Sequence, residues 1–217
     1  SLSFAQTFPT ESLLNNGDRS KLINIVVLGD GYTTAQQDQF KTDAQNITNY
    51  LFSVTPFKEY KNYFNVDIVK VPSNQSGAKH PATATDVNEP VIPASNPDNY
   101  FGSTFDYGNI HRLLVPTKYA AISSVLASNF PDYDQVLIIV NSTEYGGSGG
   151  AYATTSINAN AFEIAVHELG HSFSALSDEY WAGDVYARES ANMTQQANPS
   201  LVKWKNWYGL NSVGVFQ

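Results

Sequence analysis

The sequence contains no cysteine, so disulfide bonds and thiolate metal ligands are excluded, and any metal site must use histidine and carboxylate side chains. No apolar run approaches the ~20 residues that a membrane-spanning helix requires. Basic residues are few: 12 Lys and Arg stand against 20 Asp and Glu, and the net charge of −8 argues against a nucleic-acid partner. Charged residues make up only 15% of the chain, which is typical of extracellular or periplasmic proteins.

Apolar residues are plentiful enough for a folded core. Hydrophobic residues make up 42% of the sequence and aromatic residues 13%, which excludes a disordered chain. A length of 217 residues suits one well-buried domain. We therefore expect a single domain over 1–217, with a sheet-and-helix lobe over about 20–176 and a partial lower lobe over about 177–217.

Strand and helix patterns alternate along the first two thirds of the chain. Apolar runs and alternation predict strands over Leu22–Leu28, Tyr63–Val71 and Gln135–Val140. Gly29–Tyr32 predicts a tight loop after the first strand. Helices are predicted after a capping box formed by Thr34 and Gln37, and over Thr117–Phe130.

The most informative stretch is His167-Glu168-Leu169-Gly170-His171, which holds half of the four histidines in the chain. On a helix, residues i and i+4 share one face, so the imidazoles of His167 and His171 can supply half of a tetrahedral Zn²⁺ site. Glu168 is then placed to take a proton from a water molecule that the metal activates. Two histidines on an ordinary helix are the plainer alternative, but the context of the motif favours zinc.

Asn160–Leu176 is predicted to form the helix that carries this motif. Asn160 is a suitable N-cap, and Glu163 stands three residues later, as in a capping box. Four apolar residues recur at helical spacing and predict the buried stripe: Phe162, Val166, Leu169 and Phe173.

A catalytic zinc site needs a third protein ligand as well as an open position. The metzincin pattern places this ligand six residues after the second histidine, where this chain has Ser177, a poor zinc ligand. Asp178 follows and is the preferred ligand, provided that the helix ends near Ala175–Leu176 and the chain folds back. In a continuing helix Asp178 would lie about 10 Å along the axis from His171. The alternatives are Glu179 and, behind it, Asp184, His80 and His111.

Three further segments bear on function. Residues 72–109 are rich in Pro, Asn, Ser and Gly and predict a long, functional loop, in which His80 is expected to be a solvated surface residue. His111 adjoins an apolar run and is expected in the core or at a sheet edge. The glycine run at 146–150 lacks the Gly-Lys-Ser/Thr ending of a phosphate loop, so nucleotide binding is rejected. Ala151–Ser156 predicts an edge strand able to pair with an extended peptide, or else a flexible hairpin.

These segments together resemble the IgA-peptidase type of bacterial zinc metallopeptidases over most of residues 22–207. The matching blocks follow one another in collinear order: Asn24–Thr33, Pro56–Phe57 with Tyr60 and Tyr63–Val66, Val71–Ser73 with Ser76–Gly77 and His80–Pro81, Tyr100–Phe105, the Gly-Gly-Ser-Gly-Gly loop, His167–Tyr180, Asn192–Thr194 and Trp204–Lys205.

The resemblance implies a mixed α/β, metzincin-like catalytic domain with a twisted, mostly parallel sheet, packing helices and an active-site helix. It implies zinc as the cofactor, His167 and His171 as ligands, Glu168 as the base, and an acidic residue of the 178–180 block as the remaining ligand. It also implies a bacterial protein that is secreted or exposed at the cell surface.

We therefore expect a zinc endopeptidase that hydrolyses extracellular proteins, with immunoglobulin A and other host glycoproteins as candidate substrates. Tyr180 is either a donor to the oxyanion or a packing residue. One alternative is a surface binding module or adhesin that keeps the zinc helix without catalysis, although retention of Glu168 argues against it. The other is a zinc amidase that acts on cell-wall peptides. The sequence does not predict the oligomeric state.

Overall fold

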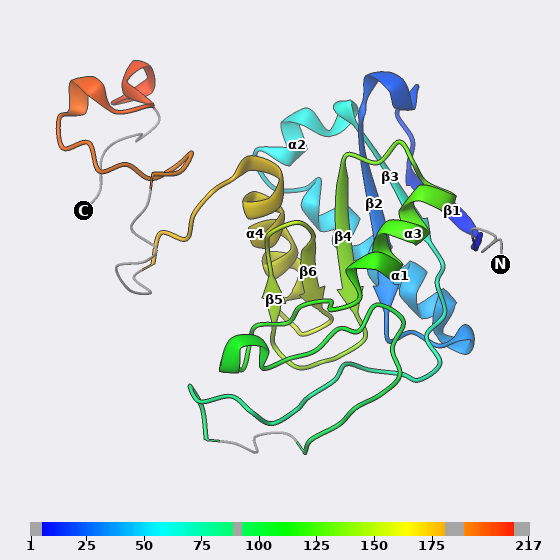
Figure 1. The fold of residues 1–217 in the computed structure, drawn as a ribbon. Helices are drawn as coiled ribbons and strands as arrows, with labels where there is room; N and C mark the ends of the chain where they lie inside the picture. The colour runs from blue at the N-terminus through cyan, green and yellow to red at the C-terminus, as the bar shows by residue number, and fades with distance from the viewer. Residues whose placement is uncertain (1–5, 89–92, 181–188, 211–217) are drawn as a thin grey trace.

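One sheet of six strands organises the computed structural model, which describes residues 6–88, 93–180 and 189–210 (Figure 1). The strands are β1 (Thr10–Leu14), β2 (Ile23–Asp30), β3 (Phe64–Val69), β4 (Gln135–Val140), β5 (Gly147–Ser148) and β6 (Ala153–Ser156). Their order across the sheet is β1-β3-β2-β4-β6-β5. The four inner strands run parallel, and the outer strands β1 and β5 run antiparallel to their neighbours. The fold is therefore mixed α/β with a mostly parallel sheet.

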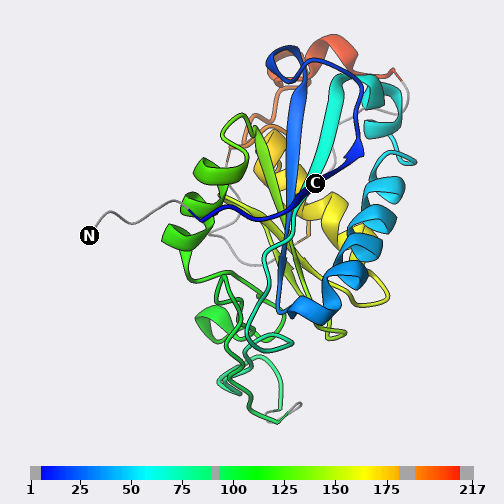
Figure 2. The same cartoon turned by 90° about the vertical axis from the view of Figure 1, so that its right-hand side faces the viewer.

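Helices cover both faces of this sheet. The α-helices of the described chain are α1 (Gln37–Leu51), α2 (Phe57–Tyr60), α3 (Tyr119–Asn129) and α4 (Ala161–Ser174). Short 3₁₀ turns occur at Arg19–Lys21, Thr34–Gln36, Lys61–Tyr63, Tyr107–Asn109, Pro199–Leu201 and Lys205–Trp207. The side view in Figure 2 places α1 and α4 on one face and α3 on the other.

Two apolar clusters, one on each face, hold these layers together. Alternate residues of β2 point to opposite faces. Ile25 and Val27 pack in the cluster beneath α1 and α4, and Val26 and Leu28 pack in the cluster beneath α3. Because both faces are covered, a central strand reads as a continuous apolar run, which is why the sequence predicts these strands well.

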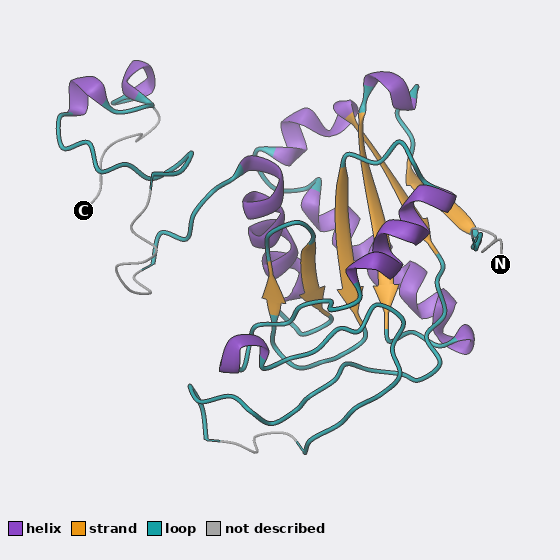
Figure 3. Cartoon of the chain, in the orientation of Figure 1, coloured by secondary structure: helices purple, strands orange, loops and turns teal. Residues whose placement is uncertain are grey.

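The predicted strands and helices form close to their expected bounds. β4 covers the predicted residues, and β3 and α3 are each shorter than predicted. β2 extends to Asp30, which pairs with Val140 of β4 instead of lying in the predicted Gly29–Tyr32 loop. The described parts of the segment 72–109 have little regular secondary structure, as expected, and run below the sheet in Figure 3.

Two predicted details were wrong. The capping box lies one residue earlier, because the chain enters α1 through a 3₁₀ turn, and the backbone N–H of Thr33 donates to the side chain of Gln36 at 3.0 Å. The strand predicted at the sheet edge over 151–156 is β6, which pairs with β4 on one side and β5 on the other. The glycine run itself supplies the outer strand, because its small residues can lie close against the neighbouring helix.

A buried carboxylate, Asp30, connects the end of β2 to the long loop. It accepts hydrogen bonds from the backbone N–H groups of Gly31 at 3.0 Å, Phe101 at 3.0 Å and Ser103 at 2.9 Å. The residue is 0% exposed, and a buried carboxylate is tolerated only where such bonds replace those to water. Asp30 therefore orders a loop that has few strand or helix hydrogen bonds of its own.

We predict that Asp30→Ala lowers the free energy of unfolding by about 3 kcal/mol or more, because it leaves several buried N–H donors without an acceptor. The matched control is Asp132→Ala, which removes an exposed carboxylate and should change stability by less than about 0.5 kcal/mol. Chemical denaturation of both variants checks this. Equal stabilities would contradict the role of Asp30 as an anchor.

Candidate metal centre

The helix predicted to carry the metal motif forms as α4, with Asn160 as its N-cap. The predicted capping box is wrong: Asn160 makes no capping hydrogen bond, and the carboxylate of Glu163 instead accepts one from the hydroxyl of Tyr50. Asn160 therefore occupies the N-cap position without a capping bond, and Glu163 connects the first turn of α4 to Tyr50 of α1.

The predicted buried stripe of α4 is confirmed for Leu169, which is buried, and for Val166, which packs against the core, but it is wrong for Phe162 and Phe173. The buried residues of the helix are Ala161, Ile164, Ala165 and Leu169. Phe162 and Phe173 are each 39% exposed and lie at the flanks, where Phe162 stacks on Tyr50 with ring centroids 5.3 Å apart and Phe173 packs on Phe64 at 5.9 Å. The small alanines face the sheet because they allow α4 to approach it closely.

The two imidazoles of the motif converge as the i, i+4 spacing predicts. The Nε2 atoms of His167 and His171 are 3.0 Å apart. The Nδ1 atom of His171 lies 2.6 Å from the carbonyl oxygen of Leu176, which can only accept a hydrogen bond. The proton of His171 is therefore on Nδ1, and the lone pair of Nε2 is left for a metal.

A tight turn at the end of α4 brings the third side chain to this point. Ala175 adopts a left-handed conformation with φ of 51°, and the N–H of Leu176 reaches back to the carbonyl of Gly170 at 3.2 Å. With the bond from the N–H of Ala175 to the carbonyl of His171 at 3.1 Å, this is the αL capping motif, which ends the helix. The chain reverses there, and Asp178 returns to the imidazoles.

Asp178 completes a three-atom centre. Its Oδ1 atom lies 3.0 Å from Nε2 of His167 and 3.3 Å from Nε2 of His171. The same oxygen is buried and has no hydrogen-bond partner in the part of the chain that the structure describes. Zn–N and Zn–O bonds are about 2.0–2.2 Å long, so one ion can contact all three atoms. The His-His-Asp donor set therefore fits a divalent transition metal.

Glu168 lies beside this centre and is suited to proton transfer. A carboxylate oxygen of Glu168 lies near the two imidazoles, but the close ion pairs of His167 and His171 among the described residues are with Asp178. Burial raises the pKa of Glu168 to about 7, and the charge of Asp178 adds to this, while His171 and Arg112 lower it. A bound cation would also favour the carboxylate. Because the close ion pairs are with Asp178, the raised pKa favours Glu168 as a base over Glu168 as a ligand.

The other proposed ligands lie elsewhere. Glu179 is exposed and accepts a hydrogen bond from the side chain of Asn192 at 2.9 Å. Asp184 lies outside the described residues. His80 is buried and His111 is mostly buried, so the prediction of a solvated His80 is wrong, and both belong to a separate group of side chains. The assignment of Asp178 as the third ligand stays a prediction that the geometry supports.

The glycine run packs against α4, a role that the sequence alone did not suggest. A Cβ atom at Gly149 would lie 2.6 Å from Cβ of His171, and one at Gly147 would lie 2.5 Å from Ile164. Only residues without a side chain can therefore lie this close to the helix. In the sequence, the four glycines around Ser148 indicate this packing role, because close approach of the backbone to another element is one of the few reasons for such a pattern.

A cleft of about 960 Å³ lies beside the metal centre, between α4 and the β5 edge of the sheet. Arg112 and Tyr180 line it opposite the two histidines, and a guanidinium N–H of Arg112 donates to the hydroxyl of Tyr180 at 3.4 Å. Burial and the nearby Asp178 raise the pKa of Tyr180, so its hydroxyl keeps its proton. Arg112 was not predicted, and no local sequence pattern marks it.

A helix with two converging histidines and an adjacent glutamate, open to a cleft at a sheet edge, is the arrangement of metal-dependent hydrolases. The model of the family described as IgA Peptidase M64 matches residues 12–213, and the chain belongs to this family. The protein is therefore a metallopeptidase whose substrates are proteins, and the resemblance seen in the sequence is confirmed. A comparison with curated proteins found no match. None of the described helices has the length and apolar character needed to cross a membrane.

We predict that Asp178→Ala weakens zinc binding by more than about 100-fold, because it removes a side chain that would contact the metal itself rather than one that only hydrogen-bonds to a ligand. Glu179→Ala is the matched control, since it removes the neighbouring carboxylate and should leave zinc affinity unchanged. Competition titrations with a zinc-binding dye measure both. Normal affinity in the Asp178 variant would move the third ligand to another residue.

We also predict that Gly149→Ala lowers the free energy of unfolding by about 1–3 kcal/mol and weakens zinc binding, because its Cβ would collide with His171. In Gly170→Ala the nearest atom to the new Cβ, on Leu176, is 3.4 Å away, so this helical substitution should be neutral or stabilising. Thermal unfolding of the two variants tests the close contact, and equal losses would contradict it.

Proposed function

We propose that this metallopeptidase is a zinc-dependent endopeptidase with a metzincin-like fold. The observation that carries the proposal is the buried Oδ1 atom of Asp178, which lies 3.0 Å and 3.3 Å from two imidazole nitrogens and has no hydrogen bond within the described residues. In the absence of cysteine, two imidazoles and one carboxylate are the donor set of a catalytic zinc site.

The chain's own residues supply the proton transfers of this mechanism. When bound, zinc polarises the scissile carbonyl and lowers the pKa of water. Glu168 accepts the proton of the attacking water and hands it to the leaving amine, and a pKa near neutrality suits both steps. The hydroxyl of Tyr180 accepts a hydrogen bond from Arg112 and lies beside Asp178, and its proton is the proposed donor to the oxyanion once substrate is bound.

The cleft supports an extended peptide as the substrate. Gly149 and Gly150 line it with exposed backbone next to His171. We propose that the substrate backbone pairs with Gly149 and Gly150, which follow β5, because the outer side of β5 is already bridged to Leu113 at Gly147. This assigns to the glycine run the role that the sequence suggested for the following strand, β6, whose two sides are both occupied.

The proposed substrates are extracellular proteins of a host, and we propose that the enzyme acts after secretion or at a bacterial surface. Immunoglobulin A, after which the family is described, is the first substrate to test. Membership of a peptidase family supports proteolysis over the adhesin and cell-wall amidase alternatives. Cleavage of muropeptides but not of proteins would favour the amidase.

We predict that Glu168→Gln lowers kcat/KM for protein cleavage by about 10²–10⁴-fold while the variant still binds one zinc ion at the α4 site. The matched control is Glu59→Gln on α2, remote from the cleft, which should keep wild-type activity. Initial rates on a fluorescent peptide library measure the effect. Undiminished cleavage by the Glu168 variant would rule out its role as the base.

A further inference from the structure

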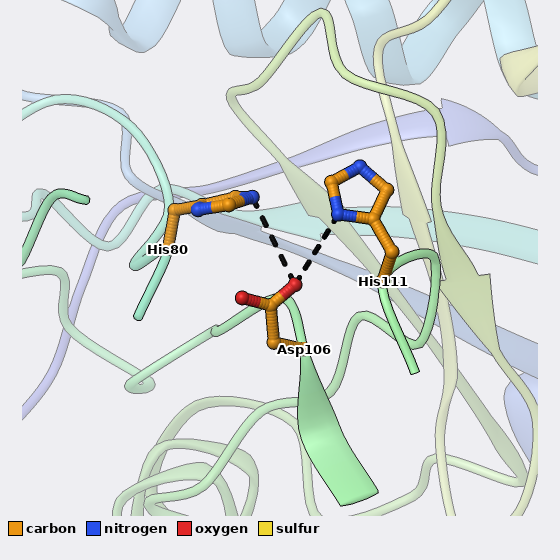
Figure 4. A group of neighbouring side chains, drawn as sticks. All are labelled: His80, Asp106 and His111. Carbon is orange, nitrogen blue, oxygen red and sulfur yellow. Dashed lines mark ion pairs between the residues drawn. The ribbon is translucent and has the colours of Figure 1, made fainter. Parts of the chain in front are cut away.

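A second group of metal-binding side chains lies outside α4: His80, Asp106 and His111 (Figure 4). One ligand-type atom from each lies within 4.8 Å of the other two. In Figure 4 both imidazoles are directed at the same oxygen of Asp106. His80 and Asp106 belong to the long loop and His111 follows it, so the cluster joins parts of the chain that no local sequence pattern connects.

Two members of this group are buried with polar atoms that make no hydrogen bond in the described part of the chain. His80 is 2% exposed, and neither of its ring nitrogens has a hydrogen-bond partner in the described chain. Asp106 is 4% exposed, and its Oδ2 atom accepts the backbone N–H of Thr83 at 2.9 Å. Its Oδ1 atom, which faces the imidazoles, makes no hydrogen bond with any described residue. Buried polar atoms of this kind call for a bound ion or water.

The distances favour a shared cation over direct hydrogen bonds. Oδ1 of Asp106 lies 3.8 Å from Nε2 of His80 and 3.3 Å from Nδ1 of His111. The first distance is too long for a hydrogen bond, but both suit atoms that surround one ion at about 2.0–2.2 Å. Two imidazoles and one carboxylate suit zinc and related transition metals, whereas calcium and magnesium take oxygen ligands.

A second carboxylate, Glu144, adjoins the group. It lies 2.7 Å from Nε2 of His111 and 3.4 Å from Nε2 of His80. A negative charge beside Nε2 of His111 favours the tautomer with the proton there, which leaves the Nδ1 lone pair for a cation. Asp106 also has φ of 58°, a left-handed conformation that costs free energy in a residue other than glycine.

We propose that His80, Asp106 and His111 form a second metal site for a divalent transition metal such as Zn²⁺, separate from the site on α4. A cavity of about 1040 Å³ gives access to it, lined by His80, Glu144 and Phe105 among other residues.

The site also lies next in sequence to the cleft. His111 belongs to the second site, and Glu144 adjoins it. The residues that follow these two in the sequence, Arg112 and Tyr145, line the cleft. The carbonyl of Arg112 accepts the N–H of Gly147 in β5 at 3.2 Å. A metal at the second site would therefore hold the long loop to the wall of the peptidase cleft.

Zinc binding at the second site is measured in full-length protein whose α4 site has been removed by His167→Ala together with Asp178→Ala. After chelator treatment, reloading with Zn²⁺ and dialysis, this background should hold one zinc per chain and unfold at a higher temperature with zinc than without. Adding Asp106→Asn should remove the zinc and the temperature shift, because the amide keeps an acceptor for Thr83 but replaces a ligand oxygen.

The matched control is Asp98→Asn, an exposed residue of the same loop, which should keep one zinc. The wild type should hold two zinc ions, and Asp106→Asn alone should hold one and keep the α4 site. The proposal is wrong if the background holds no zinc, or if the Asp106 and Asp98 variants hold equal amounts. A wild-type protein that binds no zinc at the α4 site would instead contradict the proposed function. Failure of the second-site proposal and failure of the proposed function therefore give different results.

Discussion

The site depends on where α4 ends. The helix places His167 and His171 on one face, but Asp178, the proposed third ligand, reaches them only because the chain reverses at Ala175, whose left-handed conformation ends the helix. The same reversal brings the carbonyl of Leu176 to Nδ1 of His171, which fixes the tautomer that can bind a metal. The same turn therefore brings Asp178 to the imidazoles and places the proton of His171 on Nδ1.

The parts of the fold that the sequence predicted are those governed by local patterns. Continuous apolar runs predicted β2 and β4, and the i, i+4 motif predicted the converging imidazoles. The errors arose from contacts between distant segments. Phe162 and Phe173 fit a helical stripe, but the buried residues of α4 include Ala161 and Ala165, whose small side chains allow the helix to pack closely on the sheet. His80 is buried near Asp106, which lies 26 positions away along a loop without periodicity, so no local pattern could predict its burial.

A series of contacts connects the two groups of histidines. Asp30 orders the long loop from the end of β2, and that loop supplies His80 and Asp106. His111 belongs to the second cluster, and the next residue, Arg112, lines the cleft. There the backbone carbonyl of Arg112 accepts a hydrogen bond from the N–H of Gly147. Gly149, which follows β5, in turn packs on His171. The irregular loop is therefore part of the framework that shapes the cleft.

The most direct test of the central claim is anomalous X-ray diffraction at the zinc absorption edge from crystals of the zinc-loaded protein. The account predicts a peak about 2 Å from the Nε2 atoms of His167 and His171 and from Oδ1 of Asp178. A peak at these histidines whose third protein ligand is Glu179 or Asp184, or no peak on α4 in crystals of active enzyme, would contradict it.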